Sequence, residues 1–162
     1  CEKDCSMVHG HGTQQGLYFP TAGVRLSEDT ATLLSPEMID EFVVPYMPNA
    51  ADAFGGAFVH YCGKHDYFYE TTVNLDFVRA IDLGNPEKYD TRWLLEKCAQ
   101  SQTVFYGKIA CEADESWQDY IERIANMVRS TGARCVLRPT VFPENRESCE
   151  QMQQKWHELT LI

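Results

Sequence analysis

Short apolar runs alternate with longer amphipathic segments along most of the chain. The apolar runs predict five strands, over residues 23–27, 57–62, 77–82, 103–106 and 135–137. Each run has the length of a buried strand, and the next segment has a helical spacing of apolar positions. This alternation is typical of βα units, so we expect an α/β fold with a parallel sheet.

Helix-start and helix-stop residues lie between these runs. Ser35-Pro36-Glu37 predicts a helix start, with serine as the cap and proline in the first turn. This helix should continue to about Phe54 and be interrupted by Pro45 and Pro48. A short helix is expected over residues 66–73. Further helices should start at Asn85-Pro86-Glu87, Asp114 and Pro143-Glu144-Asn145, and Gly132 should end the second of these.

Composition narrows the class of protein. The chain has 162 residues, 44% of them hydrophobic, which suits one domain with a real core. A net charge of −10 argues against a nucleic-acid or anionic-membrane partner, and no apolar run has the length of a membrane span. Seven irregularly spaced cysteines do not fit a disulfide framework, so we expect reduced thiols in a cytoplasmic protein.

The start of the chain carries little periodicity. We expect a poorly defined leader over residues 1–20, followed by one domain over residues 21–162. Cys1, Cys5 and the run His9-Gly10-His11-Gly12 would suit a metal, but a frayed end is the favoured interpretation. Because the first residue is not Met and no apolar segment follows it, we expect the chain to be part of a longer protein.

Three stretches of this sequence resemble the uroporphyrinogen decarboxylase and cobalamin-dependent methyltransferase superfamily. They are the helix LSPEMIDEFVVPY (34–46), the strand end VHYCG (59–63) and the segment DLGNPE (82–87). The family fold is a (β/α)8 TIM barrel, and the resemblance places this chain on about strands four to eight. It implies that the missing N-terminal half is supplied by another chain, or that the chain forms a homo-oligomer.

A His-x-Cys pair ends the second predicted strand. His60 and Cys62 lie two residues apart, so both side chains should point to the same side. Imidazole and thiolate suit Zn²⁺, with a third ligand and one open position. From these two residues alone, a core histidine beside a buried cysteine is the simpler interpretation.

The resemblance favours the metal site. The methyltransferase branch uses a His-x-Cys pair here and takes a third ligand, a cysteine, from its last strand, which implies Cys135. An ordinary buried thiol is the alternative at Cys135, and His65 is a fallback ligand. Cys111 and Cys149 lie on other elements and suit the role less well.

Further polar residues follow the predicted strands. Glu28 and Asp29 end the first strand and are the expected catalytic groups, which position substrate or a metal ligand at the barrel mouth; a solvated loop is the alternative. Asp82 either faces that mouth or starts a loop. Arg138 either pairs with a substrate carboxylate or phosphate, or lies on the surface.

Three functions are compatible with these residues. The resemblance implies zinc-dependent methyl transfer from a corrinoid, carried on a partner protein, to a small thiol-type acceptor. The alternative is a metal-free decarboxylase of porphyrin biosynthesis, although that branch has Gly-His-Gly on its last strand where this chain has Arg134-Cys135-Val136. The third is a non-catalytic barrel fragment. A fragment should expose inner-face residues such as Val59 or Phe58, so we also expect a homo-oligomer.

Overall fold

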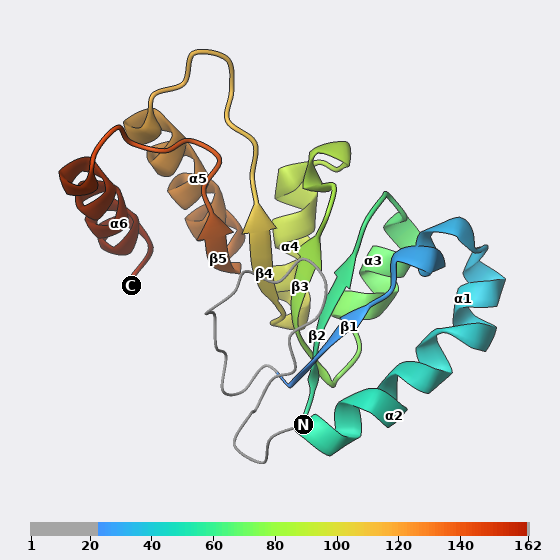
Figure 1. Ribbon diagram of the computed structural model, residues 1–162. Coiled ribbons are helices and arrows are strands. Elements are labelled where there is room, and N and C mark those ends of the chain that lie inside the picture. The colour runs from blue at the N-terminus through green and yellow to red at the C-terminus, as the bar shows by residue number, and fades with distance from the viewer. Residues whose placement is uncertain (1–22, 162) are drawn as a thin grey trace.

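A computed structural model describes residues 23–161 of the chain (Figure 1). The expected leader and its cysteines and histidines lie outside this range. In the described part, five strands form one parallel sheet in the order β1-β2-β3-β4-β5. The strands are β1 (Val24–Ser27), β2 (Ala57–Tyr61), β3 (Val78–Leu83), β4 (Val104–Lys108) and β5 (Arg134–Arg138). The predicted α/β class with a parallel sheet is therefore confirmed.

Helices connect each strand to the next. They are α1 (Pro36–Phe42), α2 (Met47–Ala51), α3 (Asp66–Val73), α4 (Thr91–Ser101), α5 (Trp117–Thr131) and, after β5, α6 (Arg146–Thr160). Short 3₁₀ turns are η1 (Asp29–Leu33), η2 (Val44–Tyr46), η3 (Asp52–Phe54) and η4 (Pro86–Lys88). In Figure 1, α3, α4 and α5 lie together behind the sheet, as expected when successive parallel strands are joined by crossovers of one hand. None of the helices in the described part is long and apolar enough to cross a membrane.

The two faces of the sheet have different chemistry. Val59, Ile81 and Phe105 are fully buried and belong to the apolar core with the helices. Side chains at the alternate positions along the strands point to the other face of the sheet, where they interact with one another. They are Arg25, Phe58, His60, Asp82, Tyr106 and Arg138. This second face is polar and aromatic, and it carries the candidate site.

The single chain buries the residues that were expected to be uncovered. Val59 is 0% exposed because it packs under the helices, and Phe58 is 1% exposed on the opposite face. The predicted exposure of these two side chains is therefore wrong. Any pairing of chains must rest on another surface.

Most helix ends agree with the sequence signals. The Ser35 side chain caps α1, and the segment containing Pro45 and Pro48 is divided into the turn η2 and the short helix α2.

Two predicted starts are wrong. The helix after β3 begins at Thr91, capped by Asp90, whereas Asn85-Pro86 opens only the turn η4. Ser116, not Asp114, caps α5; Asp114 lies before it with a φ of 58°. In both places a second capping residue stands a few positions further along the chain.

Candidate metal centre

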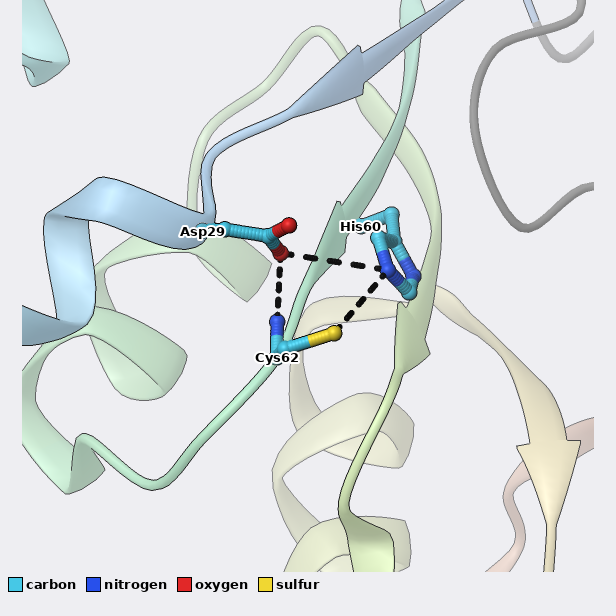
Figure 2. Close-up of side chains that lie close together, drawn as sticks. All are labelled: Asp29, His60 and Cys62. Atoms are coloured by element: carbon cyan, nitrogen blue, oxygen red, sulfur yellow. Dashed lines mark hydrogen bonds and ion pairs between the residues drawn. The ribbon is translucent and has the colours of Figure 1, made fainter.

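A group of three possible metal ligands lies where β1 and β2 end. Figure 2 shows Asp29, His60 and Cys62 directed toward one another. Ser27 pairs with His60 in the parallel ladder, and the Glu28 N–H donates to the His60 carbonyl over 2.8 Å. The chain after β1 is thereby held against the end of β2, so that η1 begins with Asp29 beside the His-x-Cys pair. The carboxyl ends of parallel strands are the usual place for binding sites in α/β proteins.

The separations between the donor atoms suit a small cation. His60 Nε2 lies 3.6 Å from Cys62 Sγ and 3.9 Å from Asp29 Oδ1, and the three donor atoms all lie within 4.8 Å of one another. Zinc bonds of about 2.0–2.3 Å in a tetrahedron imply donor separations of roughly 3.3–3.7 Å. The two separations from His60 Nε2 therefore lie within a few tenths of an ångström of those around Zn²⁺.

His60 is held with one ring nitrogen free for this group. Its Nδ1 lies 2.8 Å from Asp82 Oδ2, and both side chains are buried. An Nδ1–H that donates to Asp82 leaves Nε2 as the unprotonated nitrogen, directed at Asp29 and Cys62. A carboxylate that orients a histidine in this way is the usual partner of a metal-binding imidazole.

Asp29 is fixed by the backbone but remains open to solvent. Its Oδ1 accepts the Cys62 N–H over 2.7 Å, and Thr32 Oγ1 donates to its carbonyl in the following turn. The side chain of Asp29 is 47% exposed, whereas that of His60 is 6% exposed. The group can therefore be reached by a cation or a small molecule from the side of Asp29.

The surroundings of Cys62 favour a cation over a free thiolate. Burial raises the pKa of Cys62, and the charge of Asp29 raises it further. Cys62, His60 and Asp82 are arranged like the nucleophile, base and orienting carboxylate of a catalytic triad. However, the negative charge of Asp29 beside Sγ disfavours the thiolate form of Cys62. A bound cation reverses this effect, because it stabilises both anions at once.

Gly84 leaves room for the thiol. A Cβ at this position would collide with Cys62 Sγ and approach Cys62 Cβ to 3.2 Å. The glycine after β3 is thus needed for close approach rather than for an unusual backbone conformation. It allows the thiol to lie between the ends of β2 and β3.

Cys135 is not brought to this group. Its partner on β4 is Phe105, a core residue, and burial raises the pKa of the Cys135 thiol to about 12, with a smaller contribution from Cys98 of α4. Cys135 therefore lies on the helix side of the sheet, because strand alternation assigns it the parity opposite to His60. The third donor of the group in the structure is Asp29, whereas the resemblance implies Cys135 beside His60 and Cys62.

Two other predicted residues have different positions. The Glu28 side chain is half-buried next to Asp29, and burial, followed by the Asp29 charge, raises its pKa; it is not a member of the three-donor group. His65 caps α3, since its Nδ1 accepts the Phe68 N–H and its Nε2 donates to the Leu34 carbonyl. Both ring nitrogens of His65 are thus used in the fold.

The sequence did not reveal the role of Asp82 or the importance of Arg25. Asp82 is the register partner of His60 on β3. Its carboxylate also accepts from Arg25 Nη2 over 3.3 Å and from Arg138 Nη2 over 2.7 Å. The sequence signal that could have indicated both residues is their charge within otherwise apolar strands, because a buried charged side chain needs a partner.

Comparisons with known protein families, with curated proteins and with solved structures each gave no significant match. The superfamily resemblance remains a prediction from the three sequence stretches that suggested it.

Proposed function

We propose that this chain contributes the zinc centre of a methyltransferase related to the uroporphyrinogen decarboxylase superfamily. The reaction is methyl transfer from a corrinoid, carried on a partner protein, to a thiol-type small molecule. The observation that carries the proposal is the group of Asp29, His60 and Cys62, with His60 oriented by Asp82. The two sequence-predicted ligands His60 and Cys62 are both in this group.

At the level of the fold, we propose that the chain is the C-terminal part of a (β/α)8 barrel, about strands four to eight. Support comes from five parallel strands in sequential order and from the separation of helix-facing and opposite-facing side chains. In a barrel the polar face would line the interior, and the ends of β1 and β2 would lie at the mouth where barrel enzymes bind substrates.

The proposed ligands have distinct tasks. Asp29, His60 and Cys62 hold the metal and leave one position open for the acceptor. A bound Zn²⁺ supplies a Lewis acid that lowers the pKa of a coordinated thiol. Two anionic donors and one neutral imidazole match the charge of the ion, so metal binding leaves no net charge at the end of β2. Asp82 keeps the Nδ1 proton of His60 in place.

Activity can be tested with free methylcobalamin and a small thiol, followed by absorbance. We expect methylcobalamin consumption that requires zinc, is lost in Cys62→Ser and is retained in Cys149→Ser, which changes an exposed thiol on α6. Equal rates in Cys62→Ser, or in chelator-treated protein, would contradict the proposal. Absence of turnover in the zinc-loaded chain would contradict methyl transfer but not zinc binding.

One observation favours the second candidate, a metal-free decarboxylase acting on acidic tetrapyrroles. Arg25 and Arg138 lie on the same sheet face as His60, and such cations would suit substrate carboxylates. This candidate predicts decarboxylation of uroporphyrinogen by the chelator-treated chain, whereas the zinc proposal predicts none. A non-catalytic barrel fragment, the third candidate, predicts neither activity until a partner chain is added.

A further inference from the structure

Two arginines from opposite edges of the sheet meet at its central strand. Arg25 lies on β1 and Arg138 on β5, and both donate to Asp82 on β3. The side chains of Arg25 and Asp82 are 0% exposed, and that of Arg138 is 13% exposed. Two guanidinium groups thus share one carboxylate, and one positive charge is left without a counter-charge from it. The chain as a whole is strongly acidic, so this local excess opposes the overall charge.

Aromatic rings hold both guanidinium groups in place. The Arg25 guanidinium lies 5.1 Å from the centre of the Phe58 ring, and that of Arg138 lies 4.9 Å from the centre of the Tyr106 ring. The two rings meet edge to face with 5.2 Å between their centres. Cation–π contacts of this kind attract the guanidinium groups to the ring faces before any ligand binds.

Several donors of these arginines are unused. Arg25 Nε and Nη1 and Arg138 Nε are buried and have no hydrogen-bond partner among the residues that the structure describes. Asp82 offers little further capacity, because Oδ2 already contacts His60 and Arg25 while Oδ1 accepts from Arg138. Burying charged donors without an acceptor is unfavourable, so an additional acceptor at this place would be stabilising.

We propose that Arg25 and Arg138 form a binding site for the carboxylate of a small molecule. Guanidinium groups bind carboxylates in a planar, bidentate geometry, and the single charge of a carboxylate matches the one positive charge that Asp82 leaves unbalanced. The site lies beside the metal group, since Arg25 Nη2 and His60 Nδ1 share the same oxygen of Asp82. It uses none of the three metal donors and therefore stands whether or not zinc binds.

Acetate and phosphate distinguish the two kinds of oxyanion that arginines accept. Thermal unfolding of the full chain is followed in chelator at constant ionic strength, while chloride is replaced by acetate or by phosphate. Acetate should raise the unfolding midpoint with the logarithm of its concentration, by about 3 °C or more at ten times its dissociation constant, and phosphate should raise it less. Arg25→Met should abolish the shift and Arg138→Met should reduce it. Arg134→Met, at an exposed position of the same strand as Arg138, should retain it.

Saturation-transfer NMR with acetate gives a second readout at temperatures where each variant is folded by circular dichroism. If Arg25→Met does not fold, Arg25→Lys keeps the charge, loses the planar fork and should weaken acetate binding. Absence of an acetate effect in the wild-type chain overturns the proposal, as does an equal effect in folded Arg25→Met. A larger phosphate shift that is lost in Arg25→Met overturns the carboxylate assignment, whereas a phosphate shift kept in that variant is the general effect of this salt. An acetate effect confined to zinc-loaded protein also overturns it, because acetate then binds the metal.

Discussion

Asp82 contacts both the metal group, through His60, and the arginine pair, Arg25 and Arg138, on the polar face of the sheet. Its Oδ2 contacts His60 Nδ1 and Arg25 Nη2, and its Oδ1 accepts from Arg138. The carboxylate therefore orients the histidine of the metal group and also balances part of the charge of two buried arginines. A change at Asp82 should affect both metal affinity and stability.

The substitution Asp82→Asn tests this link. The amide keeps the shape of the side chain but no longer supports the Nδ1–H of His60 with a negative charge. We expect the zinc dissociation constant to rise about 10–100-fold, measured by competition with a chelating dye. Asp76→Asn, at an exposed position before β3, should leave it unchanged. Wild-type zinc affinity in folded Asp82→Asn would contradict the role given to Asp82.

The third ligand can be decided by comparing two substitutions. Asp29→Ala removes a donor atom from the group and should strongly weaken zinc binding. Cys135→Ala lies on the helix side of the sheet, so it should retain the metal while lowering the free energy of unfolding by about 1 kcal/mol. Metal content after gel filtration and urea unfolding measure the two effects. The reverse pattern would support the ligand set implied by the superfamily resemblance.

The sequence predicted one part of the site and missed another for a simple reason. His60 and Cys62 share a short stretch of one strand, so the period of two placed both on one side, as the structure confirms. Cys135 belongs to a strand whose parity relative to β2 depends on the register of the intervening strands. The pattern within one strand does not determine its register against another strand. For the same reason, the sequence did not predict the pairing of Asp82 with His60.

Among the elements, strands were easier to predict than helix starts. All five predicted strands overlap the observed ones, because short apolar runs bounded by turns are distinctive. The start of α4 was misplaced because Asn85-Pro86-Glu87 resembles a cap and a first turn, while Asp90 supplies the side-chain cap of the longer helix. Two capping residues close together cannot be ranked without knowing which backbone N–H groups remain unpaired.

The cap of α5 gives a prediction for stability. Ser116 Oγ accepts the Asp119 N–H over 3.2 Å and donates to the Asp119 carboxylate over 2.6 Å. Ser116→Ala should therefore lower the free energy of unfolding by about 1 kcal/mol. Asp114→Gly should be neutral or slightly stabilising, because Asp114 has a positive φ that glycine adopts without strain. Urea denaturation of both variants checks this; a larger loss in Asp114→Gly would contradict the assignment of the cap.

For the whole molecule, the open question is how the edges of the sheet are covered. Within the described residues, β1 and β5 each pair with one strand, and Val136 on β5 is 39% exposed. Because Val59 and Phe58 are buried, the tendency to associate rests on these edges and not on a bare apolar face. Unpaired edge strands favour pairing with another chain.

We therefore predict that the chain forms a homo-oligomer, most simply a two-fold dimer. Light scattering or sedimentation of the purified chain at micromolar concentration measures this directly. Lys or Pro introduced at Val136 should weaken the association if β5 is the contact. A monomer with a single cooperative unfolding transition would contradict the prediction and would show that the chain needs no partner to complete its fold.

The zinc centre is tested most directly by metal analysis of the purified full chain. Because the sequence also contains Cys1, Cys5, His9 and His11, the informative quantity is the difference between wild type and Cys62→Ser, with Cys149→Ser as the matched control. Asp29, His60 and Cys62 as ligands predict a loss of about one zinc per chain in Cys62→Ser and none in Cys149→Ser. A wild-type chain without zinc above background, or zinc unaffected by Cys62→Ser, would contradict the account.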